Sequence, residues 1–214
     1  MGFQYYFFDL DGTLTDPGLG ITNSAMYALD KFDIHVKDRK ELYSFIGPPL
    51  GDSFRNFFGF SEDQTLQAVA YFRERYSKEG LFENEVYQGI QEMLSNLKKA
   101  DCTVALATSK PHEFAVKILE HFDLYRYFDF ISAATMDGRV GKKADIILNL
   151  LNEMNVSDTN SVLMIGDRYH DIEGAKANNL KSCGVLWGYG SEAELRDAGA
   201  DYIIGKPDEL LALK

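Results

Sequence analysis

Tyr5-Tyr-Phe-Phe-Asp9-Leu-Asp11-Gly12-Thr-Leu14 is the stretch that decides the fold. The apolar run at residues 5–8 has the length of a buried strand, and it ends at two carboxylates separated by one residue. Two interpretations are open, a functional site at the strand end or a strand followed by an ordinary turn, since Asp-Gly is common in turns. A buried unpaired charge is costly, so Asp9 and Asp11 at this position imply a cation. One side chain and a nearby backbone carbonyl can hold a hard metal ion, which leaves the other carboxylate for proton transfer. Gly12 allows backbone N–H groups to approach an anion.

Composition limits the class of protein. The 214 residues suffice for one substantial domain, or for a domain that carries an insertion. A hydrophobic content of 45% is typical of a packed globular protein, and a net charge of −11 disfavours nucleic acid and anionic membranes as partners. Cys102 and Cys183 lack metal-binding spacing, which predicts reduced thiols. Without an N-terminal leader or an apolar run of ~18 residues, we expect a cytoplasmic protein.

The block at residues 24–85 contains no segment typical of a buried strand. Helical apolar spacing occurs in three stretches, residues 21–32, 54–58 and 65–76. Ser61 with Gln64 three residues later predicts a helix N-cap with a capping box. The sequence therefore predicts an all-helical insertion over residues 16–85.

From residue 86 onward, short apolar segments alternate with helical ones. The predicted strands are residues 102–107, 130–132, 162–165, 182–186 and 202–204, and the predicted helices are residues 90–97, 113–122, 144–154 and 171–178. This alternation predicts an α/β fold with a doubly wound parallel sheet covered on both faces. We expect residues 1–15 and 86–214 to form that core, with its ligand outside the carboxyl ends of the strands.

Three predicted strands end in polar side chains, and these clusters are expected at one edge of the sheet. They are Asp9 with Asp11, Thr108 with Ser109, and Asp167 with Asp171.

A carboxylate can attack phosphorus directly, and Asp9 at the strand end is the natural nucleophile. Its charge repels that of the phosphate, so a divalent cation is needed, and magnesium suits. Asp167 supplies a further metal ligand, and Asp171 lies one helical turn on, where it can face the same site.

Proton transfer and phosphate binding require further groups. Asp11 can protonate the leaving alkoxide and later deprotonate the attacking water. Thr108 and nearby backbone N–H groups can hold phosphate oxygens. A lysine can neutralise the charge that develops on the transferred group.

Four motifs in order resemble the haloacid dehalogenase superfamily. They are Asp9-x-Asp11-Gly12-Thr13, Thr108 at the end of the second core strand, a lysine before the helix at residue 144, and Gly166-Asp167-x-x-x-Asp171. The resemblance covers nearly the whole chain and implies a Rossmann-like core. It also implies Asp9 as the nucleophile, Asp11 as the acid/base with its backbone carbonyl on magnesium, and Asp167 as a metal ligand. The implied phosphate-binding residues are Gly12, Thr108, Ser109 and the lysine.

The identity of that lysine depends on a detail of the resemblance. Lys142 and Lys143 are adjacent, and the Lys-Pro pair that many relatives carry is absent. In relatives with Lys-Ala-Asp here, the lysine directly before alanine binds phosphate, so Lys143 is predicted and Lys142 is the alternative. Lys110, close to Thr108, could contact the phosphate or the substrate.

The insertion at residues 16–85 resembles the small α-helical cap of the phosphoglycolate phosphatase and β-phosphoglucomutase subgroup. Phe45-Ile-Gly-Pro-Pro-Leu-Gly51 resembles the substrate-specificity loop of such caps, and residues 82–90 resemble phosphatases named phosphoglycolate phosphatase or 5′-nucleotidase. Pro17 stands where many relatives have serine, a difference that concerns the cap hinge.

The sequence therefore predicts a magnesium-dependent phosphatase that hydrolyses a small phosphomonoester through an aspartyl-phosphate, phosphoglycolate phosphatase-like or 5′-nucleotidase-like. The alternative is a phosphosugar mutase of the β-phosphoglucomutase type, which shares every core residue. Asp11 disfavours dehalogenase chemistry, because dehalogenase relatives lack this second aspartate. Asp11 and the cap together disfavour a binding-only role. The expected partner is a small-molecule phosphate ester, with no nucleic acid or membrane, and the expected state is a monomer or weak dimer.

Overall fold

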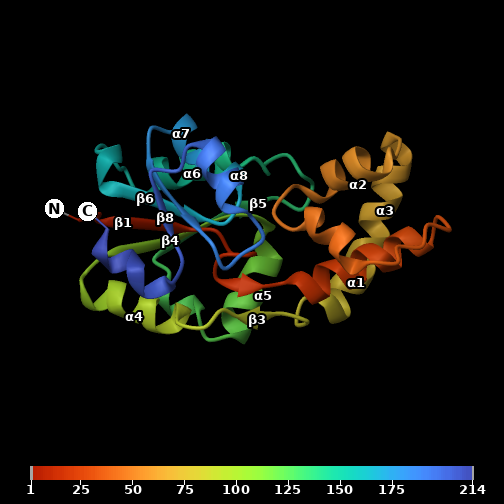
Figure 1. The fold of residues 1–214 in the computed structure, drawn as a ribbon, viewed down its shortest axis with the longest axis horizontal. Coiled ribbons are helices and arrows are strands. Elements are labelled where there is room, and N and C mark those ends of the chain that lie inside the picture. Colours follow the sequence, from red (N-terminus) through yellow and green to blue (C-terminus); the bar gives the residue numbers. More distant parts are fainter. Residues whose placement is uncertain (1, 214) are drawn as a thin grey trace. The chain divides into compact units, whose positions relative to one another are not determined.

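The computed structural model describes residues 2–213, and its internal contacts divide the chain into two compact units (Figure 1). One comprises Met1–Thr15 and Val86–Lys214, and the other comprises Asp16–Glu85. The chain leaves the first unit through the short strand β2 (Thr15–Asp16) and returns through β3 (Glu85–Val86). These two strands pair with each other, so the two ends of the insertion lie side by side in space.

The first unit is built on a six-stranded parallel sheet with the order β5-β4-β1-β6-β7-β8. The strands are β1 (Tyr5–Phe8), β4 (Thr103–Pro111), β5 (Phe130–Ala134), β6 (Val162–Gly166), β7 (Lys181–Val185) and β8 (Tyr202–Ile204). The chain adds β4 and β5 on one side of β1 and then β6 to β8 on the other, so the winding direction reverses at β1. The predicted doubly wound parallel sheet is confirmed.

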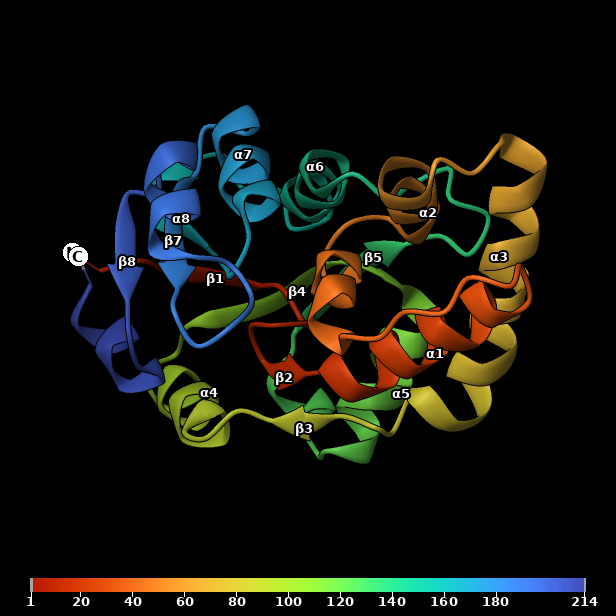
Figure 2. The ribbon, with the colours of Figure 1, turned by 45° about the vertical axis from the view of Figure 1, so that its right-hand side comes forward.

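Helices cover both faces of this sheet, as Figure 2 shows. On one face lie α4 (Ile90–Lys99) and α5 (His112–His121), and on the other lie α6 (Lys143–Glu153) and α7 (Tyr169–Ala177), with α8 (Glu192–Ala198) against α7. Phe7 and Phe8 of β1 are both fully buried, because successive strand residues face opposite covered sides. Phe7 packs in the cluster that contains Ile146 and Leu150 of α6. This packing holds the end of β1, and with it Asp9, in a fixed place.

The second unit is helical apart from its ends. It contains α1 (Gly18–Asp30), α2 (Leu50–Phe58) and α3 (Glu62–Arg75), with a 3₁₀ segment at Arg39–Phe45 and a π-helical turn at Tyr76–Gly80. The Ser61 side chain accepts a hydrogen bond from the Gln64 backbone N–H, and the Gln64 side chain accepts one from the Ser61 N–H. The predicted capping box is therefore confirmed. No helix in the described part of the chain is both long and apolar enough to span a membrane.

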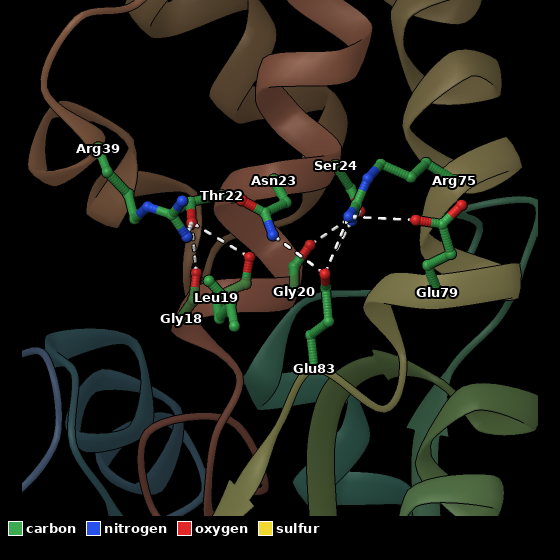
Figure 3. A network of polar contacts seen from close by, with 10 residues as sticks. All are labelled: Gly18, Leu19, Gly20, Thr22, Asn23, Ser24, Arg39, Arg75, Glu79 and Glu83. Atoms are coloured by element: carbon green, nitrogen blue, oxygen red, sulfur yellow. Dashed lines mark hydrogen bonds and ion pairs between the residues drawn. The ribbon is translucent and has the colours of Figure 1, made fainter.

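A polar network ties the helices of this unit together (Figure 3). The Arg75 guanidinium donates to both carboxylate oxygens of Glu83, at 2.8 and 2.9 Å. Asn23 Nδ2 also donates to Glu83, and Arg75 donates to Ser24 Oγ on α1. The network thus joins α1, the end of α3 and the segment that precedes β3.

Two parts of the core differ from the sequence-based expectation. The predicted strand 102–107 continues to Pro111, because Pro111 still pairs with Ala134 of β5 after an irregular register that begins at Thr108. Helix α8 is not predicted at all. It is short and polar, with Leu195 as its one buried residue, so it lacks an apolar period.

Candidate active site

Three strands of the sheet end at one edge and bring the predicted polar clusters together. Phe8, the last residue of β1, pairs with Leu106 of β4 on one side and Ile165 of β6 on the other. Asp9 continues this register, since its backbone N–H donates to the Ile165 carbonyl at 2.9 Å. Its Oδ1 accepts a hydrogen bond from the Leu10 N–H at 2.8 Å. The Asp9 carboxylate is thereby held at the switch point of the sheet, where ligands of doubly wound folds bind.

Lys143, in the first turn of α6, places its ammonium against Asp9. Its Nζ lies 2.8 Å from Asp9 Oδ1 and 2.9 Å from Asp171 Oδ1, and it donates to the Ala107 carbonyl at 2.8 Å. Burial by itself would lower the pKa of Lys143, but Asp171 and Asp9 outweigh burial and raise it. Lys142 is exposed at the N-cap of α6. Of the two adjacent lysines, the structure therefore puts Lys143 in the site.

Asp9, Asp167 and Asp171 form a cluster of buried carboxylates, with one oxygen of each within 4.8 Å of the others. Asp167 accepts hydrogen bonds from the Tyr189 N–H at 2.8 Å and from Thr13 Oγ1 at 3.3 Å. Burial, together with the charges of Asp171 and Asp9, raises the pKa of Asp167 to about 8. Burial likewise raises the pKa of Asp171 to about 6. The three carboxylates thus lie closer together than their charges favour in the absence of a cation.

The charge balance of the interior fits a divalent metal ion. The buried charged side chains among residues 2–213 are Asp9, Asp11, Lys110, Lys143, Asp167 and Asp171. Four carboxylates and two ammonium groups leave two excess negative charges when all are ionised, and buried uncompensated charge is unfavourable. Carboxylate oxygens are the ligands that Mg²⁺ prefers. Asp9, Asp167 and Asp171 therefore fit a magnesium ion, and the side chain of Asp11 lies outside this group of three.

Glycines allow the backbone to approach these carboxylates. A Cβ on Gly12, whose φ is +81°, would overlap the carboxylate of Asp167. A Cβ on Gly188 would overlap the Gly12 carbonyl oxygen and the Asp167 side chain. The indole N–H of Trp187 donates to the Thr13 carbonyl at 2.9 Å, which fixes the loop after β7 against the loop after β1. Sequence reasoning did not predict that this loop supports Asp167; its glycines directly after a strand end are the available signal.

Thr108 and Ser109 lie in the last part of β4, where the resemblance places phosphate contacts. Thr108 is buried and Ser109 is half-buried. Thr108 Oγ1 accepts a hydrogen bond from the Lys110 N–H at 3.2 Å. The Lys110 ammonium lies 2.6 Å from Asp11 Oδ2, and so contacts a carboxylate of the site. Burial raises the pKa of Asp11, and Lys110 opposes this effect.

The sequence model of the haloacid dehalogenase-like hydrolase family matches residues 6–185 of this chain. A 5′-nucleotidase of Pseudomonas aeruginosa is 44% identical over 189 residues, which are 88% of this chain and 85% of that protein. The tyrosine-protein kinase PtkA of Mycobacterium tuberculosis is 37% identical over 187 residues. That match covers 87% of this chain and 63% of the kinase.

Among solved structures, the crystal structure of a predicted phosphatase from Clostridium acetobutylicum is 46% identical, with a TM-score of 0.95. The match covers 98% of this chain and 97% of that chain. The chain belongs to the haloacid dehalogenase-like hydrolase family, in which it is a phosphoric monoester hydrolase. The family resemblance predicted from the four motifs is confirmed, whereas the roles of the individual site residues stay predictions.

Proposed function

We propose that this phosphatase is magnesium-dependent and hydrolyses a small phosphomonoester through an aspartyl-phosphate on Asp9. The placement of Asp9 carries the proposal. It is buried at the end of the central strand, and its Oδ1 is held by the Leu10 N–H and Lys143. Within residues 2–213, Oδ2 of Asp9 receives no hydrogen bond, so it is the oxygen assigned to the attack on phosphorus.

The first chemical step transfers the phosphoryl group to Asp9. As the Asp9 oxygen forms a bond to phosphorus, the bond from phosphorus to the ester oxygen breaks, and Asp11 gives a proton to the departing oxygen. Lys143 places positive charge beside the acceptor carboxylate, and Thr108 lies at the neighbouring strand end to hold a phosphate oxygen. Magnesium held by Asp9, Asp167 and Asp171 would supply further positive charge that offsets the repulsion between Asp9 and the phosphate.

The second step regenerates the carboxylate. Asp11, now ionised, takes a proton from a water molecule while the water oxygen attacks the phosphorus of the aspartyl-phosphate. The bond between phosphorus and the Asp9 oxygen breaks, and inorganic phosphate leaves. One aspartate thus serves first as the general acid and then as the general base.

The helical unit at residues 16–85 is proposed as a cap that selects the leaving group. The similarity to a 5′-nucleotidase supports a nucleoside 5′-monophosphate as the first substrate to test, with phosphoglycolate beside it. Discrimination between esters is differential transition-state binding. Pro48→Ala and Leu50→Ala should therefore change relative kcat/KM among substrates without abolishing phosphoryl transfer from acetyl phosphate, since the acceptor Asp9 lies in the other unit.

The decisive experiment incubates the wild type with magnesium and a panel of nucleoside monophosphates, phosphoglycolate and β-glucose 1-phosphate. Release of inorganic phosphate is expected, together with a phosphorylated peptide that contains Asp9. Asp9→Asn should remain folded and release no phosphate, because an amide does not attack phosphorus. Isomerised sugar phosphate without free phosphate would instead identify the mutase, and turnover by Asp9→Asn would overturn the mechanism.

A further inference from the structure

Lys110 is a buried lysine that the chemistry described above does not use. Its side chain is 4% exposed, and its ammonium lies 2.6 Å from Asp11 Oδ2. The residue follows Thr108 and Ser109 on the last part of β4, where its backbone N–H is fixed by Thr108 Oγ1 and β4 still pairs with β5. A buried lysine with a carboxylate partner on a rigid strand is a fixed point from which that carboxylate can be oriented.

The two oxygens of Asp11 have different surroundings. Oδ2 accepts the hydrogen bond from Lys110, whereas Oδ1 is buried with no hydrogen-bond partner among the described residues. A protonated carboxyl group can carry its proton on one oxygen while the other oxygen still accepts a hydrogen bond. The arrangement therefore anchors one oxygen and leaves the other available for a group that enters the site.

We propose that Lys110 is a positioning residue that holds Asp11 through Oδ2, so that Oδ1 exchanges the proton with the leaving group and then with water. This inference rests on the proposed function, in which Asp11 is the acid/base. The two buried lysines then have separate roles, because Lys143 contacts Asp9 and Asp171 while Lys110 contacts Asp11. A proton-transfer group must lie within hydrogen-bond reach of the reacting oxygen, so a carboxylate that rotates away loses the acceleration.

A direct contact of Lys110 with the phosphate is the competing explanation, and the leaving group separates the two. p-Nitrophenolate departs without a proton, whereas the alkoxide of an alkyl ester needs one. Both substrates carry the same phosphoryl group. If Lys110 acts through Asp11, Lys110→Met should lower kcat/KM for an alkyl phosphate by about 10²-fold and for p-nitrophenyl phosphate by less than about 10-fold. Equal losses on both esters would overturn the proposal.

Two matched variants support this comparison. Lys117→Met removes an exposed lysine of α5 and should leave both values unchanged. Lys110→Arg retains a positive charge beside Asp11 and should restore most of the activity on the alkyl ester, which a neutral side chain cannot do. Failure of Lys110→Arg to exceed Lys110→Met on the alkyl ester would count against an electrostatic anchor.

A double variant covers the case in which Lys110→Met leaves Asp11 unpaired and does not fold. Asp11→Asn with Lys110→Met buries no unpaired charge at this point. If Lys110 acts only through Asp11, this double variant should match Asp11→Asn within about twofold in kcat/KM for p-nitrophenyl phosphate, because coupled residues are non-additive. A further loss of about 10-fold or more would show that Lys110 contacts the phosphate directly.

The same measurements distinguish failure of this proposal from failure of the proposed function. If Asp11→Asn does not change the ratio of activities on the alkyl and aryl esters, Asp11 is not the acid and the proposed mechanism falls. If Asp11→Asn changes that ratio while folded Lys110→Met does not, the mechanism stands and the positioning role of Lys110 is wrong.

Discussion

The ammonium of Lys143 lies 2.8 Å from Asp9 Oδ1, so the first turn of α6 supplies the counter-charge to the carboxylate that ends β1. The same ammonium contacts Asp171 at 2.9 Å, and the lysine stem passes beside Gly174, where a Cβ would leave little room. One side chain therefore connects the proposed nucleophile to the proposed metal ligands.

Replacement of Lys143 tests this connection. Lys143→Ala should lower kcat/KM by at least about 10²-fold, the range expected when one preorganised charge stabiliser is removed. Lys142→Ala is the matched control, because Lys142 is the adjacent lysine and is exposed. It should change kcat/KM only slightly. Steady-state kinetics with saturating magnesium would make the comparison, and the reverse ranking would show that Lys142 binds the phosphate.

Magnesium should remove a pH dependence of the free energy of unfolding. The pKa of Asp167 is about 8 in the folded chain, against an ordinary value of 3.8. Between these values the folded metal-free protein binds a proton that the unfolded chain does not, so the free energy of unfolding should fall as pH rises from about 4 to about 8. Excess magnesium should remove this fall, because the cation favours the ionised carboxylates. Urea unfolding across this range, with chelator or with magnesium, measures both.

Asp167→Asn serves as the control for the metal-free series. The variant has no carboxyl group to titrate at this position, so its free energy of unfolding should depend less on pH than that of the wild type. Activity of the wild type should vanish with chelator and return with magnesium. Equal pH dependence of the wild type with and without magnesium would contradict the assignment of the metal site.

Gly188→Ala should damage the site through the backbone. The added Cβ would overlap the Gly12 carbonyl oxygen and the Asp167 side chain, so the loop must shift. Overpacking of this kind costs about 1–3 kcal/mol and should also weaken magnesium binding. Gly205→Ala is the matched control, because a Cβ there meets no atom within 4 Å. Calorimetric titration with magnesium and urea unfolding would test both variants; equal behaviour would refute a supporting role of the loop.

In the helical unit, Glu83→Gln should lower the free energy of unfolding at neutral pH by about 1–3 kcal/mol, because the paired hydrogen bonds from Arg75 lose a charged acceptor (Figure 3). Arg75 holds the pKa of Glu83 below its ordinary 4.5. The stabilisation is therefore present above that value and is lost as pH falls through the lower folded pKa. The difference between wild type and variant should shrink once the pH lies below the folded pKa of Glu83. Glu79→Gln removes an exposed partner 3.4 Å from Arg75 and should have little effect.

The gathering of Asp9, Thr108 and Asp167 could be predicted from the sequence for a simple reason. Strands that alternate with helices form parallel sheets, and parallel strands end at one edge. The ion pair between Lys110 and Asp11 could not be predicted, because Lys110 is a polar residue in a stretch that looks like the loop after a strand. Only the pairing of Pro111 with Ala134 extends β4 far enough to hold that lysine in place.

Contacts that depend on the direction of a side chain also could not be predicted from the sequence. Lys142 and Lys143 are adjacent, so which of them enters the site depends on where α6 begins and how it is rotated. The structure buries Lys143 and exposes Lys142 to solvent. The resemblance selected Lys143 from the following alanine, and its burial against Asp9 supplies the physical reason. Support of Asp167 by the Tyr189 N–H joins residues in separate loops, and no local pattern reports such a bond.

The order of strands in the sheet has a consequence for synthesis on the ribosome. β1 precedes the other strands of its sheet in the chain, yet its two neighbours are β4 and β6, which begin at Thr103 and Val162. The edge of β1 that pairs with β6 therefore stays unpaired during synthesis until the chain has been made past Val162. The intervening unit at Asp16–Glu85 is continuous in sequence, and domains fold as units while translation proceeds. The helical unit can thus acquire its structure before β1 has a partner on either side.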